Sequence, residues 1–373
     1  MKKKVIAAGH ICIDITPVFP DEKVEKLGDI LSPGKLINVG SADVHTGGSV
    51  ANTGMCMHKL GANVSLMGKI GNDEFGNMVL GILKEYGLDS GMIVSDTSTT
   101  SYSVVLAVPG IDRIFLHHPG ANHDFHAYDI RKDILQEAVL FHFGYPPLME
   151  SMYREEGKEL TEMFRMVSGE GVVTSLDMAA VDEKTEAGKA DWEKILGNTL
   201  PFVDLFFPSI EELLYMLDRK RYTELQKKAG GRDIIDVLSI EKDVKPLAEK
   251  LIDMGVGIAV IKCGVKGMYY KTGNADAMTR LREKSGRKLE GFENQEGLEK
   301  SYVPARVRSA TGAGDTSIGA FLCAVLSDRP LLQCMHLAAG TGASCVEEYD
   351  ALSGLRSFEE LEKKIAEGWQ KQQ

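Results

Sequence analysis

Short apolar stretches alternate with segments of helical periodicity along much of the chain. Lys4–Ala8 is an apolar stretch that ends at a glycine, whereas Ser49–Lys59 carries apolar residues at helical spacing. Because strand-like and helix-like segments alternate, the pattern predicts a mostly parallel β-sheet flanked by helices on both faces, a doubly wound α/β fold. We also expect a helix over Gly76–Tyr86 and strands over Asn63–Lys69, Val139–Phe143, Val172–Asp177, Leu205–Pro208 and Ile258–Lys262.

Two regions lack the helices that this alternation requires. Leu36–Thr46, and Thr100–Pro109 with Arg113–His117, contain alternating or β-branched residues with no helical segment between them. We expect these strands to stand apart from the main sheet as a small β-strand lid, within about residues 14–46 and 98–119.

Two polar, charged and glycine-containing stretches interrupt the second half of the chain, at residues 219–245 and 274–300. Strand-like segments resume after each of them, so we interpret both as surface insertions rather than linkers between domains. Because no internal repeat or low-complexity segment divides the chain, residues 1–373 are predicted to form a single α/β domain.

The composition excludes several classes of protein. The formal net charge is -11 and no basic stripe offsets it, which argues against a nucleic-acid partner. No apolar stretch approaches the ~20 residues of a membrane span, so no membrane partner is expected. The six cysteines are scattered singly, without a Cys-x-x-Cys pair, which argues against a disulfide framework or a zinc site and favours a cytoplasmic location.

The most informative stretch for chemistry is a glycine-rich turn before an apolar helix. Thr311, Gly312, Ala313 and Gly314 precede a single carboxylate, Asp315, at the predicted helix start. Such a turn surrounds an anion with backbone N–H groups, and the helix start adds partial positive charge. A phosphoryl group in transfer needs this cradle, and a nearby carboxylate accepts the proton of an attacking hydroxyl. We therefore expect a phosphotransferase with Asp315 as general base, kept ionised by the helix start.

A second glycine-rich turn, Gly47-Gly48, opens the predicted helix that contains Asn52. One interpretation is close approach of a ligand, with the Asn52 amide bonded to its hydroxyl; the other is an ordinary tight turn before a core helix. Asp14 lies in an apolar segment and needs a partner there, either a polyol ligand or a local turn. A dinucleotide-dependent oxidoreductase is a poor fit because Gly-x-Gly-x-x-Gly is absent.

Two further motifs follow predicted strands. Ser209 and Glu212 have the spacing of a capping box, and the functional alternative makes Glu212 an anchor for the waters around a magnesium ion. Gly264 and Gly267 suit a backbone that passes close to a nucleotide, and the alternative is a simple hairpin turn.

These residues resemble the ribokinase (PfkB) family of carbohydrate kinases over essentially the full chain. The fold of this family, a doubly wound α/β domain with a small β lid, is similar to the fold that we predict. The resemblance implies transfer of a phosphoryl group to an alcohol of a small sugar-like substrate. It is carried by Gly47-Gly48-Ser49-Val50-Ala51-Asn52 with Leu60-Gly61, and by Ala310-Thr311-Gly312-Ala313-Gly314-Asp315-Thr316 with Gly319-Ala320-Phe321.

The resemblance also implies roles for single residues. Positions that match those holding the sugar, the phosphoryl group and the nucleotide are spread over the whole chain. They are Asp14, Gly47, Gly48 and Asn52 for sugar binding, Gly312, Ala313 and Gly314 for the anion hole, Asp315 as the base, Ser209, Gly264, Gly267 and Thr311 for the nucleotide, and Glu212 for the metal.

The chain departs from the family pattern at two places. Ser209 stands where the family often has asparagine, and Asp177 is not followed by the Asp-Pro-Asn pattern of many sugar kinases. A nucleoside or vitamin-precursor kinase on the same fold, and a sugar-binding sensor without turnover, therefore stay as alternatives. The kinase hypothesis takes ATP and Mg²⁺ as cofactors and leaves a monovalent cation open. Because lids in this family often pair between subunits, it also implies a candidate homodimer.

Overall fold

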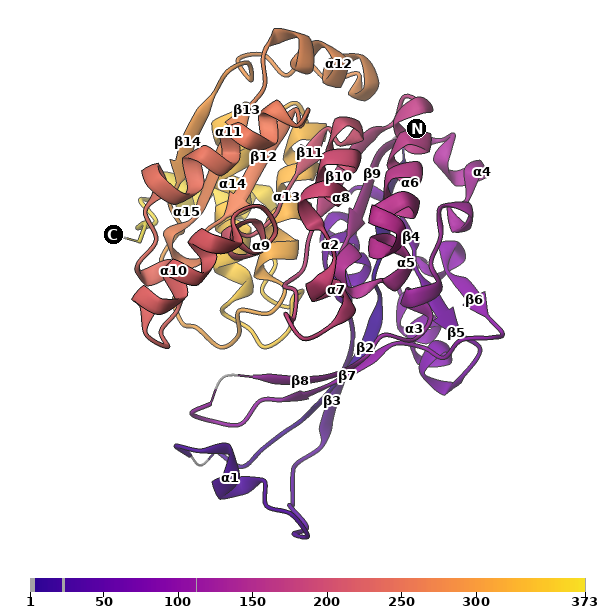
Figure 1. Ribbon diagram of the computed structural model, residues 1–373, viewed down its shortest axis with the longest axis vertical. Coiled ribbons are helices and arrows are strands. Elements are labelled where there is room, and N and C mark those ends of the chain that lie inside the picture. The colour runs from indigo at the N-terminus through magenta and orange to yellow at the C-terminus, as the bar shows by residue number, and fades with distance from the viewer. Residues whose placement is uncertain (1–3, 22–23, 112, 373) are drawn as a thin grey trace.

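An eight-stranded sheet forms the centre of the molecule, in the order β14-β13-β12-β11-β10-β9-β1-β4 (Figure 1). The computed structural model describes residues 4–21, 24–111 and 113–372. The strands from β4 to β12 pair in parallel, and β13 and β14 add an antiparallel edge. In sheet order they are β14 (Glu296–Glu299), β13 (Met268–Thr272), β12 (Ile258–Lys262), β11 (Leu205–Phe206), β10 (Val173–Asp177), β9 (Ala138–Gly144), β1 (Lys4–Gly9) and β4 (Asn63–Met67).

The apolar stretches become parallel strands because helices cover both faces of the sheet, so each strand is buried on both sides. All five residues of β10 are buried, as are five of the six in β1. The prediction of a doubly wound, mostly parallel sheet is confirmed. One predicted strand is divided: Asn63–Lys69 breaks at Gly68, and the chain continues into β5 (Lys69–Gly71), which pairs with β6 (Ile93–Ser95).

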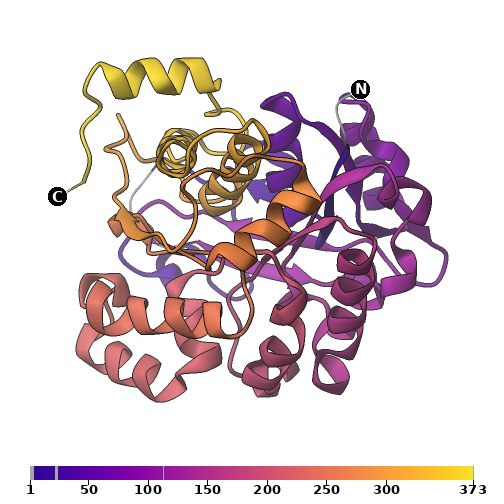
Figure 2. The same ribbon diagram turned by 90° about the horizontal axis from the view of Figure 1, so that it is seen from above.

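Two helical layers sandwich the sheet, and Figure 2 shows orange and yellow helices on one side and red to magenta helices on the other. Their apolar residues form two clusters, one on each face. One layer contains α2 (Gly48–Lys59), α3 (Glu74–Lys84), α12 (Ala275–Ser285), α13 (Ala313–Leu326), α14 (Leu331–Cys345) and α15 (Phe358–Ala366). The other contains α4 (Lys132–Leu135), α5 (Glu150–Tyr153), α6 (Lys158–Gly169), α7 (Glu186–Lys189), α8 (Trp192–Thr199), α9 (Ile210–Leu217), α10 (Arg219–Ala229) and α11 (Lys245–Asp253).

A four-stranded sheet in the order β3-β2-β7-β8 projects from this body, together with the short helix α1 (Leu27–Ile30) (Figure 1). We call it the lid sheet. It follows directly from the main sheet, because β2 begins three residues after β1 ends. Positions 22, 23 and 112 of the predicted lid segments lie outside the described residues. The strands are β2 (Cys12–Pro17), β3 (Ala42–Gly47), β7 (Tyr102–Leu106) and β8 (Ile114–His118).

The two polar stretches interpreted as insertions are more integrated than their composition suggests. Residues 219–229 form α10, whose Leu225 is fully buried against the core. The end of the 274–300 stretch is β14, which pairs with β13 at the edge of the main sheet. An edge strand shows one side to solvent and needs few apolar residues, which explains why its pattern resembles a loop.

Candidate active site

Asp315 lies in the first turn of α13, where the glycine-rich turn enters the helix. Gly312 is the residue before the helix and has a left-handed backbone with φ of 76°. A Cβ at this position would overlap the side chain of Ala351, so both the backbone and the packing require glycine. The turn that we predicted from the glycines therefore delivers Asp315 to a helix start.

Two side chains from different elements hold the Asp315 carboxylate. The Asn52 amide donates to Oδ2 at 2.9 Å, and the Tyr145 hydroxyl lies 2.8 Å from both carboxylate oxygens. Asn52 was predicted as a site residue, whereas Tyr145 was not. Tyr145 follows β9 and has a left-handed backbone with φ of 68°, which a sequence gives no means to anticipate. Asp315 itself is only 3% exposed.

Burial changes the electrostatics that we expected for Asp315. Loss of solvent raises the pKa of this carboxyl group, and hydrogen bonds from Asn52 and Tyr145 together with the Lys262 charge oppose that rise. That the carboxyl group is ionised at neutral pH stays a prediction, and burial works against it. Burial also raises the pKa of Tyr145 well above its ordinary value, so this hydroxyl stays protonated and donates to the carboxylate.

A cavity of about 230 Å³ lies between the lid sheet and the body, and Asn52, which holds the Asp315 carboxylate, is among its lining residues. Asp14, Asn52 and Thr311, all predicted site residues, line it. Arg113 and Phe115 from the lid sheet also line it, and the Arg113 guanidinium contacts the Thr311 hydroxyl. The cavity therefore joins the two glycine-rich turns to the lid sheet, and we call it the acceptor pocket.

The Gly47-Gly48 turn makes room for polar side chains at the edge of this pocket. A Cβ on Gly47 would overlap the Asp14 carboxylate, and one on Gly48 would overlap His10. Asp14 lies within β2, and burial raises its pKa while the Cys12 thiol, 3.3 Å from Oδ1, opposes this. His10 is buried, its Nε2 is 3.4 Å from Nε2 of His117, and burial lowers its pKa well below the ordinary value.

Ser209 and Glu212 form a complete capping box at the start of α9. The Glu212 backbone donates to the Ser209 hydroxyl at 3.2 Å, and the Ser209 backbone donates to Glu212 Oε2 at 2.6 Å. Ser209 also pairs with Lys262 as an isolated β-bridge, so the box lies at the carboxyl edge of the sheet. One Glu212 oxygen is thus used by its own helix, and the metal role stays a prediction.

Gly264 and Gly267 lie in the turn that joins β12 to β13. Both have positive φ, 53° and 106°, and the Gly267 carbonyl accepts from the Cys263 backbone at 2.8 Å. The hairpin alternative thus describes the local structure. Because the turn follows Lys262, whose side chain packs on Gly314, it lies at the same edge of the sheet as Asp315.

Sequence reasoning missed one further pair at this edge. Lys262 ends β12 and Asp177 ends β10, and the lysine Nζ lies 2.6 Å from Asp177 Oδ1. Both residues were treated as parts of strands. The signal available in the sequence was a charged residue at the end of each of two buried strands, because the carboxyl ends of parallel strands meet at one edge.

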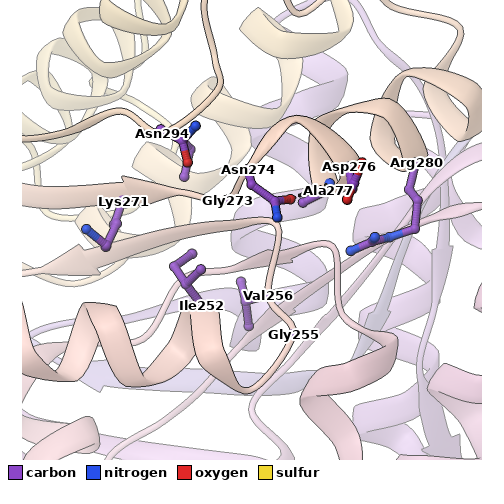
Figure 3. A pocket seen from close by; sticks show the side chains of 11 residues that line it. Ile252, Gly255, Val256, Lys271, Gly273, Asn274, Asp276, Ala277, Arg280 and Asn294 are labelled. Carbon is purple, nitrogen blue, oxygen red and sulfur yellow. Dashed lines mark hydrogen bonds between the residues drawn. The ribbon is translucent and has the colours of Figure 1, made fainter.

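A second cavity, of about 350 Å³, lies at the opposite end of the sheet (Figure 3). Gly255 and Val256, just before β12, line it together with Asn274 at the start of α12. None of the predicted site residues lines this cavity. We therefore place the candidate active site at the carboxyl edge, where ligands bind in open α/β sheets.

Comparison with known families identifies the chain. Residues 4–357 match the model of the pfkB family carbohydrate kinases. The protein belongs to the PfkB family of carbohydrate kinases. It is therefore a sugar kinase, a phosphotransferase with an alcohol group as acceptor, as the sequence predicted.

Individual relatives support the same assignment over nearly the whole chain. A probable fructokinase-4 of Arabidopsis thaliana is 24% identical and covers 97% of this chain and 96% of its own length. An uncharacterized sugar kinase of Archaeoglobus fulgidus is 25% identical, over 81% of this chain and 98% of its own. Among solved structures, Arabidopsis thaliana ribokinase complexed with ribose and ATP has a TM-score of 0.70 at 19% identity, covering 97% of this chain and 98% of that one.

Two further findings concern the part of the chain that the structure describes. No helix in it is long and apolar enough to cross a membrane. The described residues also include no group of three or more His, Cys, Asp or Glu side chains placed to hold a metal ion.

Proposed function

We propose that the protein transfers the γ-phosphoryl group of ATP to a hydroxyl of a small sugar or sugar derivative. The observation that carries the proposal is the position of the Asp315 carboxylate at a helix start, where it is held by Tyr145 and by Asn52, a lining residue of the acceptor pocket. In this proposal Asp315 removes the proton of the acceptor hydroxyl. The intact arrangement also argues against a sensor without turnover, which needs no base.

The remaining roles follow from position. The backbone N–H groups of Gly312, Ala313 and Gly314, at the start of a helix of 14 residues, stabilise charge on the phosphoryl group. In the acceptor pocket, the Asp14 carboxylate accepts hydrogen bonds from the sugar hydroxyls, and the Asn52 amide donates hydrogen bonds to them. Gly47 and Gly48 keep the space that these polar groups occupy.

The nucleotide is proposed to lie along the carboxyl edge, near Ser209, Gly264, Gly267 and Thr311. ATP and Mg²⁺ as cofactors are supported by a putative Ribokinase II of E. coli, which is described in complex with both and has a TM-score of 0.69 at 19% identity over 98% of this chain. Mg²⁺ usually uses one or two carboxylates together with phosphates and water, which suits Glu212 with its one uncommitted oxygen. When bound, the ion neutralises phosphate charge. A monovalent cation stays an open part of the proposal.

A second candidate, a kinase for nucleosides or related vitamin precursors, is favoured by the rim of the acceptor pocket. Three partly exposed aromatic side chains line it: Tyr86, Phe115 and Tyr349. Aromatic faces stack on planar bases, and they also pack against sugar rings. Phosphorylation assays with D-fructose, D-ribose and adenosine as acceptors separate the two candidates by which acceptor is used.

The lid sheet is proposed to cover the acceptor, because Arg113 and Phe115 reach the pocket from it. It is also the proposed contact of a homodimer. Val18, Leu36 and Leu116 are large apolar residues that it leaves at least half exposed.

The proposal is tested by replacing the base. We expect Asp315→Asn to lower kcat by roughly 10²–10⁴-fold, because the amide cannot take the proton, while a non-hydrolysable ATP analogue still binds. Asp276→Asn is the matched control, since Asp276 lies in the first turn of α12, beside the second cavity at the opposite end of the strands from Asp315. Turnover near that of the unmodified enzyme in Asp315→Asn would refute the role of this carboxylate.

A further inference from the structure

The ion pair between Lys262 and Asp177 lies beneath the glycine-rich turn. The Asp177 side chain is 1% exposed, whereas the Lys262 side chain keeps 17% of its surface accessible. The lysine is therefore the member of the pair that reaches the site. The aspartate lies behind it, at the end of a strand in which every residue is buried.

Lys262 packs against the backbone of the proposed anion hole. A Cβ built on Gly314 would lie 3.3 Å from Lys262 Cδ and 3.6 Å from its Nζ. Because glycine occupies this position, no side chain separates the ammonium group from the first turn of α13. The ammonium group of Lys262 and the N–H groups at the start of α13 therefore direct positive charge toward the same space.

The surroundings keep this lysine charged. Burial lowers the pKa of Lys262, but the nearby Asp177 and Glu212 carboxylates and the hydrogen bond to Asp177 raise it by more, so the net shift is upward. The Asp177 Oδ2 atom is buried without a hydrogen-bond partner in the described structure. A buried pair with one unsatisfied oxygen is a poor means of stabilising a fold, which favours a functional reason for its presence.

We propose that Lys262 binds the terminal phosphate of ATP and neutralises charge on the phosphoryl group as it moves, with Asp177 as the positioning residue. This inference rests on the proposed function. The bond from the γ-phosphorus to the ADP oxygen breaks as the bond to the acceptor oxygen forms, and Asp315 takes the hydroxyl proton. Lys262 neither gives nor takes a proton; its fixed charge acts where negative charge must be stabilised.

The rival explanation is that the pair only joins β10 to β12. Removing the lysine alone would not separate the two, because an uncompensated buried carboxylate destabilises a protein by itself. The double variant Lys262→Met/Asp177→Asn removes both charges, leaves the net charge unchanged and keeps similar side-chain volumes. It therefore tests the position of the cation rather than the stability of the fold.

The measurement is calorimetric titration with two probes, the ATP analogue AMPPNP with Mg²⁺, and AMP. We expect the double variant to bind AMPPNP at least about tenfold more weakly than the unmodified protein, while AMP affinity changes by less than about twofold. AMP is the control ligand because it lacks the terminal phosphates. AMPPNP affinity within about twofold of the unmodified protein would overturn the inference.

The chain offers a matched control pair at the other end of the sheet. Lys284 Nζ lies 2.8 Å from Asp204 Oδ2, and the two side chains are 18% and 14% exposed. Lys284→Met/Asp204→Asn should leave both affinities unchanged. If the site variant does not fold, Lys262→Gln/Asp177→Asn and Lys262→Arg replace it: only the first, which has no cation, should lose AMPPNP affinity, and equal affinities in the two would overturn the inference.

Failure of this inference is distinguishable from failure of the proposed function. Turnover retained in Asp315→Asn would remove the proposed mechanism whatever Lys262 does. Normal AMPPNP binding in the Lys262 double variant, with Asp315→Asn inactive, would remove only the role of Lys262.

Discussion

At the scale of single residues, the site depends on how Asp315 is kept able to accept a proton. Burial raises its pKa, which favours the neutral acid and works against a base. The hydrogen bonds from Asn52 and Tyr145 stabilise the anion and limit that rise. The hydroxyl of Tyr145 is thus one of the groups that extend the proposed base's working range toward lower pH.

Replacing Tyr145 tests this directly. Tyr145→Phe removes a donor to the carboxylate, so the pKa of Asp315 should rise further, and more of the base is protonated at any acidic pH. The acidic limb of the profile of kcat/KM against pH should therefore move to higher pH, by about one unit if one hydrogen bond to a charged group of roughly 1.5 kcal/mol is lost. Activity on the alkaline plateau should change less.

Tyr269→Phe is the control for this experiment. The Tyr269 hydroxyl also donates to a carboxylate, Glu296, at 3.2 Å, on the edge strands β13 and β14. Its loss should leave the profile unmoved. An acidic limb in Tyr145→Phe that coincides with that of the control would contradict the role given to Tyr145.

The site residues that the sequence predicted differ from those that it missed in one respect: a local sequence pattern marks only the former. Asn52 and Asp315 follow glycine-rich turns, inside α2 and in the first turn of α13, where the local sequence marks the start of a helix. Tyr145, Asp177 and Lys262 act through partners 85 or more positions away in the chain, so only the folded sheet edge brings them into contact. Such long-range pairs have no local pattern.

At the scale of elements, the start of α13 determines the geometry of the whole site. The helix begins only because Gly312 turns the chain with a positive φ in the space left by Ala351. The periodic segments of the sequence predicted α2, α3 and most of the buried parallel strands, because their pattern reflects the side that is covered. It failed for β14 and α10, which are mostly polar and show much of their surface to solvent.

We expect Gly312→Ala to destabilise the protein by roughly 2–5 kcal/mol, since a left-handed alanine contributes about 1–2 kcal/mol and an overpacked contact about 1–3 kcal/mol. Denaturant unfolding measures this change. Adding Ala351→Gly should recover the part due to overlap and leave the backbone strain. Gly81→Ala, at an open position inside α3, should instead stabilise by about 0.5–1 kcal/mol. A Gly312→Ala midpoint equal to that of the unmodified protein would show that α13 can start without glycine.

At the scale of the whole molecule, the lid sheet has two different faces. Side chains alternate along β8, so Phe115 and His117 share one face and Leu116 lies on the other. Phe115 lines the acceptor pocket and His117 contacts His10, which places this face toward the body. Leu116 therefore points away from the pocket, and it is 55% exposed. The outward face is the one available to a second copy of the chain.

The proposed dimer predicts that a charge on this face separates the subunits. Leu116→Lys should sediment as a monomer at micromolar concentration, where the unmodified protein is expected to be a dimer, because a lysine in an apolar contact loses hydration without gaining a partner. Leu332→Lys is the matched control: Leu332 is also 55% exposed, but it lies on α14, far along the chain from the lid sheet. That variant should remain a dimer. An unmodified protein that sediments as a monomer would contradict the dimer itself, whereas a dimeric Leu116→Lys variant would move the contact to another surface.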